Sequence, residues 1–250
     1  MRSIVALLLA GLAAGAEEPA PKTDLKPGEV EIGEPGAKIE DPAVARKKVA
    51  DFLDEYKAEK DEEKRAAVVR KLGEWDHAEI LKAALKLVGD RNRFVAIEAA
   101  VVVARQRDTA KAGTALHRAL QMEKRPDVAC ALLVALGKVG YAKAFKDAEK
   151  WYVKDTTETS KAAARYFGYT KAKDAFRLLA ERLEEPRPKN PDDPNNPPAS
   201  YWEARWKEWN SNLPHVRWAL SQIAEGETFE RTVEAKEWAE KEGRKLGINW

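Results

Sequence analysis

An approximate repeat of 31 to 32 residues is the feature of this sequence that most limits its fold. Four positions separated by this spacing are equivalent: Gly73, Arg105, Gly137 and Gly168. The residues five, four and one before each of them are apolar in every case, although only 44% of the chain is hydrophobic. These residues are Val68, Val69, Leu72, Ala100, Val101, Ala104, Leu132, Leu133, Leu136, Ala163, Ala164 and Phe167. Their spacing places each triplet on one face of a helix, so it predicts a first helix in every unit.

A second apolar stripe follows each of these positions after a short turn, in which Asp76 and Asp108 are expected to cap the next helix. No alternation of β-branched residues indicates a strand. A hairpin of two such helices buries about six side chains at about 1.5 to 3 kcal/mol each, which is less than the entropy of ordering thirty-odd residues at about 1 kcal/mol each. Each hairpin therefore needs its neighbours. We expect an all-α fold, a right-handed α-solenoid of helical hairpins with about five units.

The repeat is interrupted once before it returns. Residues 185–199 form a stretch rich in Pro, Asn and Asp, which predicts a surface loop. Beyond it, Ala219, Leu220 and Ile223 occupy the equivalent apolar positions before Ala224, and a partner helix is expected from about Thr232 to Leu246. The repeat domain is thus expected over 41–184, and residues 200–250 are expected to close it with tryptophan-rich helices.

The N-terminal residues predict export. Residues 1–16 combine Arg2, an apolar run of about eleven residues and a small-residue end, which is typical of a signal peptide and too short to span a membrane. Residues 17–40 are rich in Pro, Gly and charge, which predicts a flexible leader. Asp41 and Pro42 then open a helix that is expected to run to about Lys57. We expect a periplasmic or extracellular protein with no membrane association after cleavage.

Composition excludes several classes of function. Without Arg2 the chain has 43 basic and 42 acidic residues, which argues against nucleic-acid binding. The single cysteine, Cys130, excludes an internal disulfide and is expected to be a small buried side chain. The three histidines have no metal-ligand spacing, and no catalytic or phosphate-binding motif is present. We therefore expect neither a cofactor nor a metal, and no enzyme activity.

The unit length and paired helices resemble the short HEAT-like repeats of the phycobilisome-lyase type. The resemblance covers residues 61–184. The segment 219–226, Thr228-Phe229 and the helix that carries Trp238 are similar to the end of many exported bacterial HEAT-like proteins, although Lys241 stands where a second tryptophan is common. The resemblance implies an α-solenoid that binds other proteins, and it names no ligand.

Two candidate partner surfaces follow from the expected helices. Polar positions of the second helices form a mostly basic ridge, which favours an acidic protein segment or an anionic glycan; its members include Lys82, Lys111, Arg118, Lys143 and Lys150. Trp202, Trp206 and Trp209 share one face of a helix that begins near Ser200. This stripe is interpreted either as a cover for the end of the core or as an aromatic platform for a peptide or sugar.

The function expected from these features is a non-catalytic, extracytoplasmic scaffold or adaptor that binds another, unidentified protein. A carbohydrate- or peptide-binding module that uses the tryptophan stripe is one alternative. An enzyme or enzyme-accessory subunit is the other, and it would need a cluster of titratable groups in a cleft beside the proline-rich loop, where Asp192 and Asp193 are the candidate acids.

Overall fold

The computed structural model describes residue 30 and residues 32–109, 111–153, 157–188, 190 and 193–250. Over these residues the chain is helical apart from two strands of two residues each, so the all-α prediction is confirmed. The α-helices are α1 (Pro42–Ala58), α2 (Glu62–Leu72), α3 (Ala78–Leu85), α4 (Arg93–Ala104), α5 (Ala112–Met122), α6 (Pro126–Lys138), α7 (Phe145–Val153), α8 (Thr157–Thr170), α9 (Phe176–Ala180), α10 (Ala199–Ile223) and α11 (Thr232–Lys241). There are also three short 3-10 helices in the described residues: η1 (Ala142–Ala144) precedes α7, η2 (Lys173–Ala175) precedes α9, and η3 (Gly243–Leu246) follows α11.

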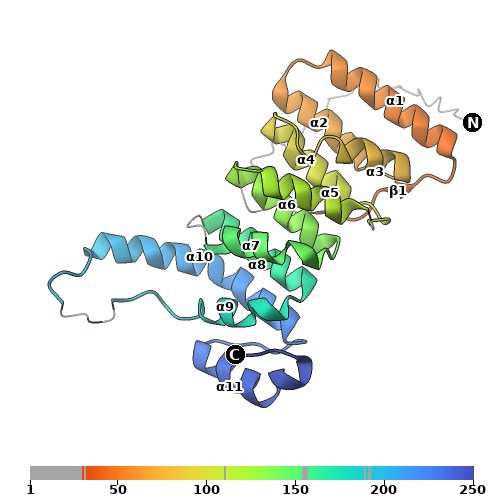
Figure 1. The fold of residues 1–250 in the computed structure, drawn as a ribbon. Coiled ribbons are helices and arrows are strands. Elements are labelled where there is room, and N and C mark those ends of the chain that lie inside the picture. Colours follow the sequence, from red (N-terminus) through yellow and green to blue (C-terminus); the bar gives the residue numbers. More distant parts are fainter. Residues whose placement is uncertain (1–29, 31, 110, 154–156, 189, 191–192) are drawn as a thin grey trace, which may run out of the picture.

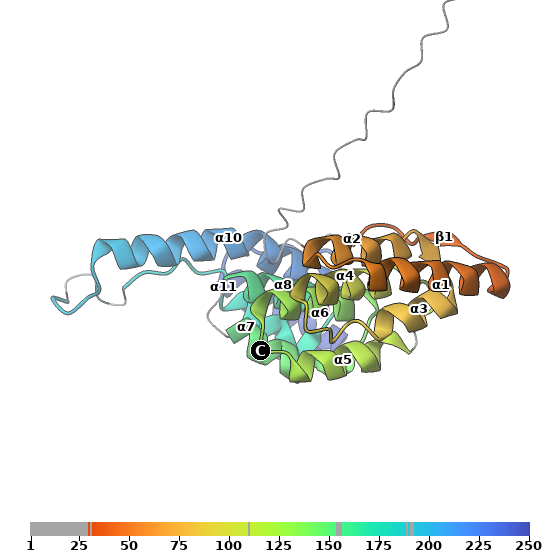
Figure 2. The ribbon, with the colours of Figure 1, turned by 90° about the horizontal axis from the view of Figure 1, so that it is seen from above.

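The first helices of the repeat pack in sequence order. α2 contacts α4, α4 contacts α6, α6 contacts α8, and α8 contacts α10 (Figure 1). The helices α3, α5 and α7 lie on one side of this row (Figure 2). Such packing of consecutive hairpins is consistent with a helical repeat.

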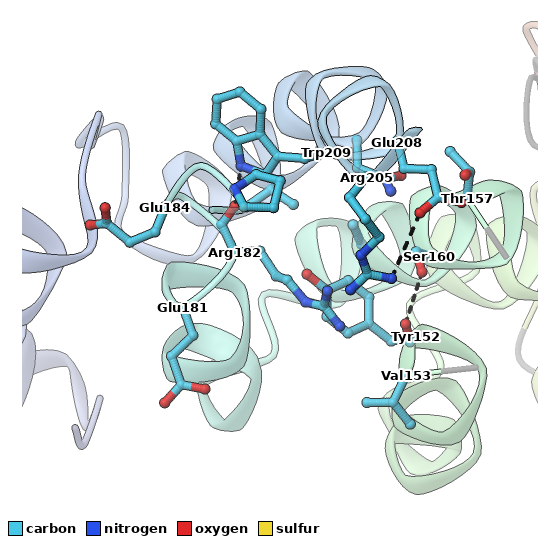
Figure 3. Close-up of a pocket in the computed structure, with 14 residues that line it drawn as sticks. Tyr152, Val153, Thr157, Ser160, Glu181, Arg182, Glu184, Arg205, Glu208 and Trp209 are labelled. Carbon is cyan, nitrogen blue, oxygen red and sulfur yellow. Dashed lines mark hydrogen bonds and ion pairs between the residues drawn. The ribbon is translucent and has the colours of Figure 1, made fainter. Parts of the chain in front are cut away.

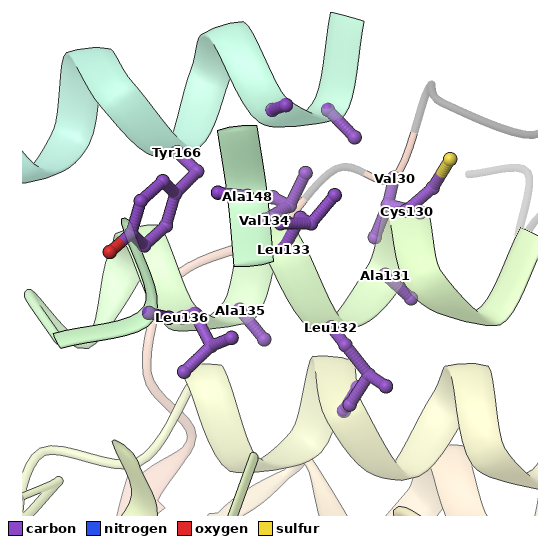
Figure 4. Packing of buried hydrophobic residues seen from close by; sticks show 14 of the residues in the cluster. Val30, Cys130, Ala131, Leu132, Leu133, Val134, Ala135, Leu136, Ala148 and Tyr166 are labelled. Carbon is purple, nitrogen blue, oxygen red and sulfur yellow. The ribbon is translucent and has the colours of Figure 1, made fainter. Parts of the chain in front are cut away.

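The apolar positions of the repeat form the centre of the structure. Ten of the twelve residues that define it are buried, whereas Val101 and Ala104 are half-buried and pack against the core. α6 is the most enclosed helix, because every residue from Val128 to Gly137 is buried (Figure 4). A helix with neighbours on all sides needs apolar or small residues on every face, as α6 has.

Glycines on α5 and α8 allow aromatic rings to approach these helices closely. A Cβ atom added to Gly168 would lie 2.4 Å from Trp218, and one added to Gly113 would lie 2.2 Å from Tyr141. The missing side chain is therefore what lets α10 pack against α8 through Trp218.

Helix starts follow from local side-chain capping, although two expected caps are wrong. Asp61 and Asn92 accept hydrogen bonds from main-chain N–H groups in the first turns of α2 and α4. Asp76 does not cap α3, because His77 does so through the N–H of Glu79. Asp108 does not cap α5 either, since that helix begins three residues after the expected turn, with Lys111 as its N-cap.

Asp76 instead joins one turn of the repeat to the next. Its carboxylate accepts hydrogen bonds from the main-chain N–H of Arg107 at 3.0 Å and from the guanidinium of the same residue at 3.1 Å. Arg125 makes an equivalent link, because its guanidinium donates to the main-chain carbonyls of Asp90 and Arg91. These turns are thus cross-linked by bonds between residues 31 to 35 positions apart, which cap signals in the sequence do not reveal.

The expectation of a flexible leader over 17–40 does not hold for residue 30 and residues 32–40. Ala37–Lys38 forms a strand, β1, that pairs in parallel with Trp75–Asp76, β2. Val30 and Ile39 are buried, and Gly36 lies so close to the main chain of Glu74 that an added Cβ would be 2.5 Å from it. The β1–β2 pair also corrects the expectation that the repeat has no strand. The predicted signal peptide and residues 17–29 lie outside the described residues.

Both ends of the repeat differ in detail from the prediction. α1 begins at Pro42 behind an Asp41 cap and ends one residue beyond the expected Lys57, which confirms that helix. α10 is a single helix of 25 residues that continues through Pro214, so the tryptophan stripe and the apolar residues Ala219, Leu220 and Ile223 share one helix. The last predicted helix divides into α11 and η3. No helix within the described ranges is long and apolar enough to cross a membrane.

Candidate partner-binding groove beside α10

A cavity of about 170 Å³ lies where α10 leaves the row of first helices. We call it the α10 groove. Its walls come from α7 and α8, from the segment after α9 and from α10; the lining residues are Tyr152, Val153, Thr157, Ser160, Ala164, Glu181, Arg182, Glu184, Pro186, Arg205, Glu208, Trp209, Asn212 and Val216. Because the row of first helices continues only through the C-terminal half of α10, the N-terminal half is left to form a wall (Figure 1).

The α10 groove has an aromatic base held by the segment after α9. Tyr152 is buried, and the guanidinium of Arg182 lies 5.7 Å from the centre of its ring. The indole N–H of Trp209 donates to the main-chain carbonyl of Arg182 at 3.0 Å, which fixes α10 to that segment. Burial raises the pKa of the Tyr152 phenol, against an opposing effect of Arg182, so this ring stays uncharged at neutral pH.

The charges of the groove are arranged with the two arginines at its centre. Figure 3 shows the guanidinium groups of Arg182 and Arg205 converging near Tyr152, whereas Glu181 and Glu184 point away. Glu181 pairs with Arg177 at 2.8 Å, and Glu184 accepts the main-chain N–H of Thr232 at 3.1 Å. Glu208 lies 3.9 Å from Arg205, at the edge of ion-pair distance. Two guanidinium groups thus lie at the centre of the groove, whereas its rim carries carboxylates.

Two polar groups of the groove bear on what it can bind. The side-chain oxygen of Asn212 is buried and has no hydrogen-bond partner among the described residues, so it offers an acceptor to a bound donor. The hydroxyl of Ser160 donates to the carbonyl of Tyr152 at 2.8 Å. That hydroxyl is thus engaged by the main chain of α7.

The three tryptophans of the predicted stripe are placed differently. Trp209 packs against the core and lines the groove. Trp206, whose ring centre is 6.3 Å from that of Trp209, is 42% exposed. Trp202 is half-buried and stacks edge-on against Tyr201, which is itself exposed. One ring of the stripe thus contributes to the core, as expected for a cover, while another faces solvent beside the cavity.

The residues of the predicted basic ridge are all exposed on or just before second helices. Lys150 pairs with Asp147 at 3.0 Å, so its charge is offset locally. Among the described residues, none of the other four forms an ion pair with a carboxylate; these are Lys82, Lys111, Arg118 and Lys143. Lys82 lines a second, largely apolar cavity of about 190 Å³ between α1 and α3, together with Phe52 and Tyr56.

The remaining titratable groups serve the structure. His117 contacts the carboxylate of Asp147 at 2.8 Å, which links α5 to α7. Burial raises the pKa of the Cys130 thiol to about 12, so it stays protonated. Asp193 accepts hydrogen bonds from Asn195 within its own loop, whereas Asp192 lies outside the described residues. The described part of the chain contains no group of three or more His, Cys, Asp or Glu residues that could hold a metal ion.

Sequence reasoning found Trp209 but missed most of the α10 groove. Tyr152 lies next to Trp151, Arg182 lies in a segment rich in charge, and Arg205 lies between tryptophans, so local sequence does not mark any of them as part of a site. The three come from different elements that meet only because α10 packs back on α8. The insertion before α10 was the one available signal, since an added loop at the end of a repeat often carries function.

Comparisons with known proteins assign no family to this architecture. No family model matches the sequence, and neither the curated proteins nor the solved structures contain a match to the chain.

Proposed function

We propose that this chain is an exported, non-catalytic adaptor that binds an acidic segment of another protein in the α10 groove. In this proposal the helices form a right-handed α-solenoid of about five HEAT-like units. The regular packing of α2, α4, α6, α8 and α10 supports that architecture, as does the recurrence of buried residues every 31 to 32 positions.

The observation that carries the proposal is the convergence of Arg182 and Arg205 over the buried ring of Tyr152, next to Trp209 (Figure 3). Arginine, tyrosine and tryptophan are the residue types most enriched at the energetic centres of protein interfaces. Guanidinium groups recognise carboxylates through charge-assisted hydrogen bonds. The ligand chemistry that fits is therefore a carboxylate next to an apolar anchor.

The size of the cavity favours one inserted side chain over a whole small molecule. Ligand pockets for small molecules commonly measure about 300 to 1,000 Å³, whereas a cavity of about 150 Å³ accepts a benzene-sized group. At about 170 Å³ the α10 groove suits a single aromatic or branched side chain. The exposed Trp206 next to it extends the contact area along the partner segment.

The test uses a labelled heptapeptide with a central Phe flanked by Asp and Glu, titrated against the mature chain by fluorescence anisotropy. Arg205→Gln should weaken binding about tenfold or more, because a hydrogen bond to a charged group contributes about 1.5 to 3 kcal/mol. A peptide with Ala in place of Phe should also bind at least tenfold more weakly. Binding of the parent peptide should fall as salt rises.

Arg118→Gln is the matched control, since this exposed arginine lies on the basic ridge on α5 and not in the groove. It should leave the affinity unchanged. Equal losses of peptide affinity in the two variants would assign the binding site to the basic ridge instead of the groove. Absence of any binding by the parent chain would refute the groove proposal.

A second proposal is a glycan site on the tryptophan face, and the exposure of Trp206 is the observation in its favour. In that case an array of anionic and neutral glycans should yield a ligand whose binding is lost in Trp206→Ala and kept in Met122→Ala, a change at a residue that is 78% exposed on α5. An array without a ligand would remove this alternative.

A further inference from the structure

The described part of the leader, residue 30 and residues 32–40, crosses the first helices as an extended chain. Figure 2 shows it running toward β1 on the side of the row opposite α3, α5 and α7. The guanidinium of Arg165 on α8 donates to the carbonyl of Val30 at 2.9 Å, and Arg105, just beyond α4, donates to the carbonyl of Glu34 at 2.9 Å. The leader then pairs with the turn between α2 and α3. It therefore runs against the order of the repeat.

The dimensions of an extended chain suit this path. Packed helices are about 8 to 10 Å apart, and an extended chain advances about 3.3 Å per residue, so about three residues cross one helix. The path from α8 to the turn after α2 crosses three such spacings. Residues 30 to 39 supply the required length, and the apolar residues Val30 and Ile39 are buried near its two ends.

Most of the polar contacts along this path are made by the main chain of the leader. Both arginines bind carbonyl oxygens, and the N–H groups of Ala37 and Ile39 donate to the carbonyls of Glu74 and Asp76 at 2.8 and 3.2 Å. Among the described residues, neither Arg105 nor Arg165 forms an ion pair with a carboxylate. Side-chain requirements are the apolar residues Val30, Ile32 and Ile39 and a glycine at position 36, where any Cβ would meet the main chain of Glu74.

We propose that this face of α2, α4, α6 and α8 is a binding groove for an extended peptide, and that the leader fills it as an intramolecular ligand. Its ligand in trans is a segment with apolar residues at its first, third and tenth positions and a glycine at its seventh, as in Val30, Ile32, Ile39 and Gly36 of the leader. Such a segment binds through its main chain to Arg105, Arg165 and the edge of β2. It competes with the leader, which is tethered through Asp41 to α1 and so has an effective concentration of about millimolar.

The test measures capture of a fluorescent peptide with the sequence of residues 28–41 by the mature chain. Two variants should release the tethered leader while leaving the groove intact. Gly36→Val places a side chain against the main chain of Glu74, and Ala37→Pro removes the N–H that donates to the same residue. Each released chain should bind the peptide at least about tenfold more tightly than the parent chain, because the competing leader is lost.

Gly89→Val is the matched control, because a Cβ at Gly89 would have no atom within 4 Å, so this variant should bind as weakly as the parent. Adding Arg105→Ala and Arg165→Ala to Gly36→Val should return binding to the parent level, and a peptide that itself carries Gly36→Val should not bind. Faster tryptic cleavage after Lys38 in both released chains checks that the leader has left. Cleavage that accelerates without any gain in peptide binding would overturn the proposal, as would binding that survives the loss of both arginines.

Discussion

α6 and the N-terminal half of α10 are helices with opposite surroundings. Every residue of α6 from Val128 to Gly137 is buried, whereas in α10 the first buried residue is Leu213, fourteen positions after the helix begins. α6 packs between α4 and α8, but the row of first helices provides no second neighbour for the start of α10. Packing therefore restricts the buried side chains of α6 to apolar or small ones. In α10, every side chain before Leu213 remains exposed or half-buried.

The largest effect in this comparison is expected from truncation in α6. Leu133→Ala should lower the free energy of unfolding by about 2 to 5 kcal/mol, because it leaves a cavity at a fully buried position. Trp206→Ala removes a larger side chain but one that is 42% exposed, so it should cost about 1 kcal/mol or less. Urea unfolding followed by circular dichroism measures both. The contrast between the helices fails if the two losses are equal.

A smaller loss of stability is expected when a side chain is added where α8 contacts α10. Gly168→Ala forces a methyl group to within 2.4 Å of Trp218 before relaxation, so the free energy of unfolding should fall by about 1 to 3 kcal/mol. In Gly89→Ala the new methyl group meets no atom within 4 Å, and the change should be within about 0.5 kcal/mol. Thermal unfolding of both variants measures these two changes in stability. A neutral Gly168→Ala would mean that Trp218 does not hold α10 on the stack.

The smallest effect concerns the second helices and depends on pH. Burial raises the pKa of Asp147, but hydrogen bonds from His117, Lys150 and Gln121 outweigh it, so the pKa lies below its usual range. Because an unfolded aspartate titrates near 3.9, Asp147 stabilises the fold above about pH 5 and loses this contribution as the pH falls through its lower folded value. Asp147→Asn should therefore flatten the decline of the melting temperature between pH 5 and pH 2.

Arg177→Gln is the control for this titration, because it removes an ion pair between exposed side chains. It should change the decline of the melting temperature at low pH very little. If the melting temperature of Asp147→Asn declines between pH 5 and pH 2 as steeply as that of the parent chain, the contact between α5 and α7 contributes no stability through this carboxylate.

The periodic part of the fold could be predicted because it depends on side-chain burial. The spacing of Val69, Leu133 and Ala164 places them on one face of a helix, and the structure buries all three. Capping at Asp76 was predicted wrongly because its partner, Arg107, is 31 residues away and no local pattern reports it. The continuity of α10 through Pro214 has no local signal either, because a proline inside a helix removes a main-chain hydrogen bond.

The docked leader and the α10 groove escaped prediction for related physical reasons. Composition marks the leader as too polar to fold, yet the bonds that hold it are made by its main-chain carbonyls and N–H groups, which every sequence has. The groove depends on where Arg182, Arg205 and Tyr152 meet in space. Trp209 was recognised because its signal, a tryptophan at helical spacing, is local.

The length of the docked leader also limits the number of first helices that it can cross. Neighbouring turns are joined only pairwise, as by Asp76 and Arg107, so these bonds alone would tolerate the loss or gain of a whole hairpin. The leader is different because it is fastened at α8, beyond α4 and after α2 at the same time. Removing one hairpin between these points would leave about three leader residues in excess, and adding one would leave it about three residues short. In this protein a change in hairpin number must be matched by a change in leader length.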